Sequence, residues 1–91
     1  MPVRVRIPSS LHAQTGGAAE VHVDGNTVDQ ALRSLEARFP ALTPHLRLED
    51  GSLRPVVNLY VNDKHVRFRQ GLDTPLHDGD QLYFVPLVMG G

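Results

Sequence analysis

Two segments with alternating apolar and polar residues are followed by one amphipathic helical segment, and this order restricts the possible folds more than any other feature. Residues 2–8, PVRVRIP, and residues 19–24, AEVHVD, repeat an apolar side chain at every second position, as a half-buried strand does. The loop between them contains Gly16-Gly17, and the two segments predict a hairpin with one apolar face. The expected inward-facing residues are Val3, Val5, Ile7, Ala19, Val21 and Val23.

A capped helix is predicted directly after this hairpin, over TVDQALRSLEARFP at residues 27–40. Thr27 stands where its hydroxyl can accept a bond from the first turn, and Gln30 three residues later completes a capping box. Pro40 ends the helix. The two half-apolar strands need a cover, so the apolar stripe is predicted to pack on them. That stripe consists of Val28, Ala31, Leu32, Leu35 and Phe39.

Three further strands are predicted in the second half of the chain. Residues 56–63, VVNLYVND, form a third strand with its turn, residues 65–68, HVRF, a short fourth, and a fifth follows the turn at Asp78-Gly79-Asp80. The predicted fold class is therefore α+β, with a mixed sheet of four to five strands packed on one main helix. Residues 41–55 are expected to be irregular, with three leucines against the core: Leu42, Leu46 and Leu48.

Strand parity leaves an aromatic and aliphatic patch on the uncovered face of this sheet. Polar Asn58 fixes the alternation in the third strand, so Tyr60 faces outward beside it. In the fifth strand the same rule turns Tyr83 and Val85 outward. Contiguous exposed apolar surface marks partner sites, so we expect Tyr60, Tyr83 and Val85 to contact a partner. The inward residues of the two strands are Val57, Leu59, Val61, Leu82 and Phe84.

The composition is that of one small globular domain and disfavours several classes of partner. The 91 residues carry a net charge of −1, with eight arginines and Lys64 interspersed among ten acidic residues. Nucleic acid is not expected as a partner, because duplex binding needs clustered positive charge. A membrane is not expected either, since no segment approaches the ~20 apolar residues of a span. We expect a cytoplasmic protein.

The sequence predicts no catalytic residue, no metal site and no bound cofactor. It has no cysteine, and its five histidines include no pair three or four residues apart. The serines fit no nucleophile elbow, Gly16-Gly17 lacks the Lys-Ser/Thr of a P-loop, and the acids around residue 78 lack EF-hand spacing. The protein is therefore not expected to be an enzyme, and any reacting group is expected at its C-terminus.

The last seven residues, VPLVMGG, join an apolar run to two glycines and a carboxylate. A carboxylate with a reference pKa of ~3.5 is an anion at neutral pH and can attack an activated phosphate. Gly90, without a Cβ, would let the Gly91 carboxylate enter a narrow channel. Ordering this tail costs roughly 1 to 2 kcal/mol per residue, which burial in a partner's groove would offset. The side chains expected there are Leu87, Val88 and Met89.

These features predict a domain over residues 1–86 and a flexible C-terminal tail over residues 87–91. The same residues would also fit the plain end of an edge strand, which leaves the glycines without a role. The order of hairpin, helix and strands in front of the glycines favours the tail, and a resemblance adds to this. The segments VNLYVNDKHVRF at 57–68 and GLDTPLHDGDQLYFVPLV at 71–88, followed by Gly90-Gly91, resemble the ubiquitin-like β-grasp sulfur carriers of the MoaD/ThiS family, most closely the CysO type.

The resemblance implies a carrier function. An E1-like enzyme would adenylate Gly91 with ATP and magnesium, and sulfur would then replace AMP to give a thiocarboxylate. For a CysO-like protein the acceptor would be a PLP-dependent cysteine synthase in cysteine biosynthesis, followed by a metalloprotease that releases the cysteine. Three alternatives stay open: the small subunit of molybdopterin synthase, acting with the large subunit; a ubiquitin-like modifier conjugated to lysines; and a non-covalent binding module.

Overall fold

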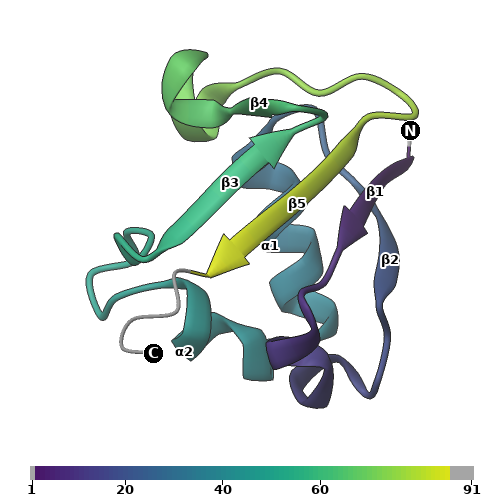
Figure 1. The fold of residues 1–91 in the computed structure, drawn as a ribbon, viewed down its shortest axis with the longest axis vertical. Helices are drawn as coiled ribbons and strands as arrows, with labels where there is room; N and C mark the ends of the chain where they lie inside the picture. Colours follow the sequence, from purple (N-terminus) through teal and green to yellow (C-terminus); the bar gives the residue numbers. More distant parts are fainter. Residues whose placement is uncertain (1, 87–91) are drawn as a thin grey trace.

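One mixed sheet of five strands runs through residues 2–86, the residues that this computed structural model describes (Figure 1). The spatial order of the strands is β2-β1-β5-β3-β4. β1 pairs antiparallel with β2 and parallel with the central β5, while β3 pairs antiparallel with both β5 and β4. This confirms the predicted mixed sheet. The strands are β1 (Pro2–Arg6), β2 (Glu20–Asp24), β3 (Val57–Val61), β4 (Lys64–His65) and β5 (Gln81–Pro86).

The main helix, α1 (Val28–Arg38), covers one face of the sheet. The Thr27 hydroxyl oxygen accepts a hydrogen bond from the Gln30 N–H at 3.2 Å, as predicted. The Gln30 side chain in turn accepts from the Asn26 N–H at 2.8 Å, one residue before the position that a standard capping box uses. The helix buries Val28, Ala31, Leu32 and Leu35 against Val3, Val5, Val21, Val23, Leu59, Val61, Leu82 and Phe84, and Phe39 packs half-buried at its end.

Short helical turns fill the connections between these elements. None of the helices within residues 2–86 is long and apolar enough to cross a membrane. Leu42 and Leu46 are fully buried, as predicted, but Leu48 is 39% exposed and its predicted burial is wrong. It precedes a tight turn in which the Gly51 N–H donates to the Leu48 carbonyl, and this turn holds Leu48 at the surface. The turns are η1 (Ser9–Thr15), η2 (Pro40–Leu42), α2 (Thr43–Leu46), η3 (Val66–Phe68) and η4 (Gly71–Asp73).

The first loop is more ordered than its sequence suggested. The chain after β1 forms η1, which buries Leu11 and Thr15. The Thr15 hydroxyl donates to the Ala18 carbonyl at 2.9 Å and so ties the end of η1 to the start of the next strand. The expected inward position of Ala19 is wrong, because β2 begins one residue later, at Glu20, and the Ala19 side chain is exposed.

The predicted fourth strand over residues 65–68 is also wrong in its extent. β4 ends at His65, and the chain then turns into η3. The cause is local, because the His65 ring Nδ1 accepts a hydrogen bond from the Arg67 N–H at 3.0 Å and so caps the turn. Val66 is buried by this turn, whereas Phe68 is left 70% exposed.

A cluster of charged groups fastens the segment after α1 to the helix. The Arg47 Nε donates to both carboxylate oxygens of Glu36 at 2.9 Å, and the Thr43 hydroxyl donates to the same carboxylate at 3.0 Å. The side chains of Arg47 and Glu36 are each only 10% exposed. The hydrogen bond to Glu36 raises the pKa of Arg47, and burial opposes this rise. The cluster is therefore structural.

Candidate functional site

The face of the sheet away from α1 carries the predicted aromatic residues. Tyr60 on β3 and Tyr83 on β5 are direct cross-strand partners, and their rings are stacked with centroids 5.2 Å apart and planes 8° apart. The His65 ring from β4 meets Tyr60 edge-on at 5.0 Å. Because Leu59 and Leu82 are buried while the two tyrosines are partly exposed, the predicted parity is confirmed.

The same row of cross-strand neighbours becomes charged toward the other edge of the sheet. Arg6 of β1 lies opposite Tyr83, and Glu20 of β2 lies opposite Arg6. Both charged side chains are exposed. A partner that lies across this face would meet aromatic rings over β3 and β5 and a pair of opposite charges over β1 and β2.

Val85 extends the patch toward the end of β5. It is 47% exposed and lies opposite Asn58, whose side-chain oxygen is 3.0 Å from the His65 Nε2. An apolar side chain therefore borders the point where the described chain ends. The other predicted tail and contact residues lie outside the described residues and stay predictions, as does the predicted tail over residues 87–91: Leu87, Val88, Met89, Gly90 and Gly91.

A shallow, open groove follows β5 where it runs beside β1. Its lining includes Arg6, Pro8, Ser9, Tyr83 and Val85. Such an open groove suits an extended segment or the surface of another protein more than an enclosed small molecule. The chemistry available on this face is recognition through stacking, apolar contact and a few charges.

The open face carries features of a binding surface, and the residues with shifted pKa values lie in another part of the molecule. Residues 2–86 contain no group of three or more side chains that could hold a metal ion. The pKa shifts that are resolved fall on Arg47 and on Asp50, where hydrogen bonds from Ser52 lower the pKa of the carboxyl. Both residues belong to the segment that follows α1 and lie outside the open face.

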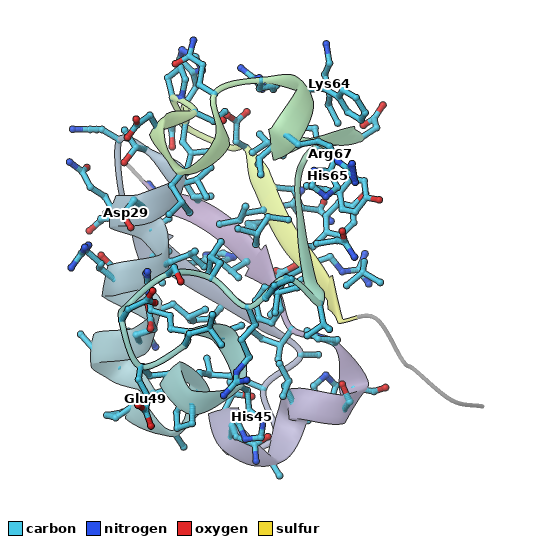
Figure 2. All side chains as sticks on the ribbon, turned by 90° about the vertical axis from the view of Figure 1, so that its left-hand side faces the viewer. Asp29, His45, Glu49, Lys64, His65 and Arg67 are labelled. Atoms are coloured by element: carbon cyan, nitrogen blue, oxygen red, sulfur yellow. The ribbon has the colours of Figure 1, made fainter. Side chains whose placement is uncertain are left out.

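Sequence reasoning missed one part of this surface, the exposed ring of Phe68. It placed HVRF in a strand, where alternation would have put the Phe68 ring on the same face as Val66. The available signal was a histidine after the Asn62-Asp63 turn, a residue type whose side chain can cap a following turn. In Figure 2, His65 and Arg67 lie on the side of the sheet away from α1, and Asp29 lies on the helix side.

Comparison with known proteins identifies the family to which this chain belongs. Residues 5–91 match the ThiS family, and the chain belongs to that family. The chain is also 40% identical, over 93 residues, to the sulfur carrier protein CysO of Mycobacterium tuberculosis, with all of both proteins covered. The fold is thereby shown to be the ubiquitin-like β-grasp that the sequence resemblance implied.

A solved structure and a second relative extend this comparison. CysO of Amycolatopsis orientalis, determined in a complex with BexX, matches 98% of this chain and 99% of its own with a TM-score of 0.89 and 39% identity. Small archaeal modifier protein 3 of Haloferax volcanii is 43% identical over 68 residues, which cover 75% of this chain and 73% of the relative. The chain is therefore similar both to sulfur carriers and to a protein modifier.

Proposed function

We propose that this protein is a sulfur carrier and that its reactive group is the carboxylate of Gly91. The observation that carries the proposal is the family match through residue 91, together with full-length similarity to named sulfur carriers. An E1-like enzyme would use ATP and magnesium, and a carboxylate oxygen of Gly91 would attack the α-phosphorus and displace pyrophosphate. Hydrosulfide would then attack the acyl carbon, and AMP would leave as the thiocarboxylate forms.

In this proposal the folded body is a handle for partner enzymes. Tyr60, Tyr83 and Val85 would contact the activating enzyme, because they form the apolar part of the open face and adjoin the end of β5. The tail residues would enter the enzyme, with Gly90 giving clearance and the apolar run burying its side chains. The protein itself would supply no catalytic group, and the reactions would take place in the cytoplasm with ATP.

We propose cysteine biosynthesis as the pathway, with a PLP-dependent cysteine synthase as the sulfur acceptor. The support is the 40% identity to CysO over the whole chain. Incubation of the thiocarboxylate form with that synthase and an O-activated serine should replace the leaving group on the serine Cβ by the sulfur of the thiocarboxylate and yield a protein-bound cysteine. Transfer to the large subunit of molybdopterin synthase, and copurification with it, would instead favour the molybdopterin alternative.

Mass spectrometry of the intact protein tests the main proposal. The protein is incubated with the E1-like enzyme, ATP, magnesium and sulfide, and one oxygen should be exchanged for sulfur at Gly91. The matched control carries one extra alanine after Gly91, which keeps the folded body and moves the carboxylate. Exchange in the control at the same rate, or no exchange in the unaltered protein, would contradict the proposal.

A protein modifier is the second candidate, favoured by the similarity to small archaeal modifier protein 3. The same activated Gly91 would then join a lysine amine of a target protein. Lys64 is the single lysine of the chain, so self-conjugation could use only that side chain or the N-terminus. Isopeptide-linked adducts on reducing gels, found by mass spectrometry to contain a Gly91-to-lysine bond, would support this function.

A further inference from the structure

Phe68 and its neighbours form an exposed surface that adjoins the tyrosine pair at Tyr60. At 70%, Phe68 is the most exposed large apolar side chain in the described part of the molecule. Its ring is met edge-on by His65, with centroids 6.3 Å apart, and the Arg67 guanidinium carbon lies 5.6 Å from its centroid. A hollow lies beside this ring, and we call it the Phe68 hollow. Its lining consists of Asn58, Tyr60, Asp63, Lys64, His65, Arg67 and Phe68.

The charge around the Phe68 hollow differs from that of the protein as a whole. The chain carries a net charge of −1, but Lys64 and Arg67 line the hollow, and Arg69 is the residue after Phe68. Asp63 offsets one of these positive charges. All four charged side chains are exposed, so they are available to a partner. An apolar ring within a cationic rim is complementary to an apolar side chain flanked by carboxylates.

The Phe68 hollow extends along β3, from the β4 end of the strand to Asn58, which lies opposite Val85 near the end of β5. Val57 of β3 pairs with Pro86 at one end of the strand, and Val61 pairs with Lys64 at the other. Four residues of strand separate these ends by about 13 Å at ~3.3 Å per residue. Figure 1 shows β4 and the tip of β5 near opposite ends of β3. A partner that fills the whole hollow would therefore reach the residues beside the end of β5.

We propose that the Phe68 hollow is a docking site for a partner-protein segment that carries one apolar or aromatic side chain between acidic residues. The apolar side chain would pack against Phe68 and the edge of His65, and the carboxylates would pair with Lys64 and Arg67. Docking here requires no sulfur transfer, so the proposal stands or falls separately from the carrier function.

A nucleic acid fits the Phe68 hollow less well than an acidic peptide does. Binding to a nucleic acid backbone needs several neutralised phosphates along a track, whereas the hollow offers Lys64, Arg67 and Arg69 with Asp63 among them. A small hollow with a few cations at its rim matches a short side-chain motif in size.

Titration of the intact, isotope-labelled protein in amide NMR spectra tests this proposal with three probes. The first is the acetylated heptapeptide Glu-Asp-Glu-Phe-Asp-Glu-Leu, the second has lysine at each acidic position, and the third is a six-nucleotide oligouridylate. We expect the acidic peptide to shift the amides of His65, Arg67 and Phe68 in a saturable manner, and the other two to bind at least about tenfold more weakly.

Two exposed variants and one matched control make the result decisive. Arg67→Glu and Phe68→Ser should each weaken binding of the acidic peptide by about tenfold or more. Arg33→Glu reverses the charge of an exposed arginine on α1 and should leave binding of the acidic peptide unchanged. Thermal unfolding verifies that all three variants fold. Absent or unsaturable shifts, equal binding of the lysine peptide, or tighter binding of the oligouridylate would overturn the proposal.

Discussion

The two faces of the sheet differ in what covers them. On the α1 side, Val5, Leu32, Leu35 and Leu82 have no exposed surface. On the open side, the tyrosine pair is partly exposed and Val85 retains nearly half of its accessible surface. Both faces carry apolar groups, but only one of them is covered by the rest of the described chain.

This difference places the stabilising contacts on one face and leaves the other exposed for the partner contacts proposed above. Burial removes apolar area from water at roughly 25 cal/mol per Å², so the covered face supplies most of the folding free energy. α1 also closes the β2 edge, because the Arg38 guanidinium donates to the His22 carbonyl and the Ser34 hydroxyl donates to the Asp24 carbonyl, both at 2.8 Å. The open face remains free to meet a partner.

The largest effect is expected from truncating a residue on the covered face. Leu35→Ala should lower the free energy of unfolding by about 2 to 5 kcal/mol, because it leaves a cavity between α1 and the sheet. Val85→Ala on the open face is the matched control, and we expect a loss below about 1 kcal/mol. Urea unfolding measures both, and similar losses would break the contrast between the faces.

A somewhat smaller effect is expected at the turn between β2 and α1. A Cβ at Gly25 would lie 2.6 Å from the Ala31 backbone nitrogen, so Gly25→Ala must shift the backbone of either the turn or the helix. We expect a loss of about 1 to 3 kcal/mol. Gly79→Ala is the control, since its Cβ would meet no atom within 4 Å and only its φ of 86° is unfavourable. A loss at Gly79 greater than at Gly25 would show that the close approach is unimportant.

Next in size is the charged cluster that attaches the 41–55 segment to α1. Arg47→Met removes the hydrogen bonds to the Glu36 carboxylate, which is 10% exposed, and should cost about 2 kcal/mol. The double variant Arg47→Met with Glu36→Gln should recover part of this loss, because it leaves no buried unpaired charge. Thermal unfolding measures both variants, and a double variant less stable than the single one would contradict the assigned role.

The smallest effect is a pH dependence at an exposed turn. Hydrogen bonds from Ser52 lower the pKa of Asp50 in the folded state, so its contribution is present above the usual pKa of about 4 and is lost as the pH falls through the folded value. Asp50→Ala should therefore be slightly less stable than the unaltered protein at pH 7, and this difference should shrink as the pH falls below the usual pKa. A difference that grows on acidification would have the wrong sign.

Patterns that depend on period and capping could be predicted from the sequence. The alternation around Val5 and Leu82 predicted the strands and their faces, and Thr27 with Gln30 marked the helix start. Side-chain bonds to the backbone outside a recognised helix-capping motif could not be predicted, because they leave neither a period nor a fixed spacing. The bond from Thr15 that shapes η1 and the His65 cap that ends β4 are of this kind.

The candidate site divides in the same way. Parity alone placed Tyr60, Tyr83 and Val85 on the open face, since side-chain direction in a strand follows directly from its period. The stacking of the two tyrosines depends on the register between β3 and β5, which one sequence does not specify. The exposed ring of Phe68 depends in turn on where β4 ends.

The most direct test removes the tyrosine pair and measures stability and activation together. The double variant Tyr60→Ser with Tyr83→Ser should remain folded in a thermal unfolding experiment, while the E1-like enzyme should need at least about tenfold more of it for half-maximal sulfur exchange at Gly91. We expect the exchange at saturation to be unchanged, because the reacting carboxylate is intact. A folded double variant activated at the same concentrations as the unaltered protein would contradict the division between a stabilising and a recognising face.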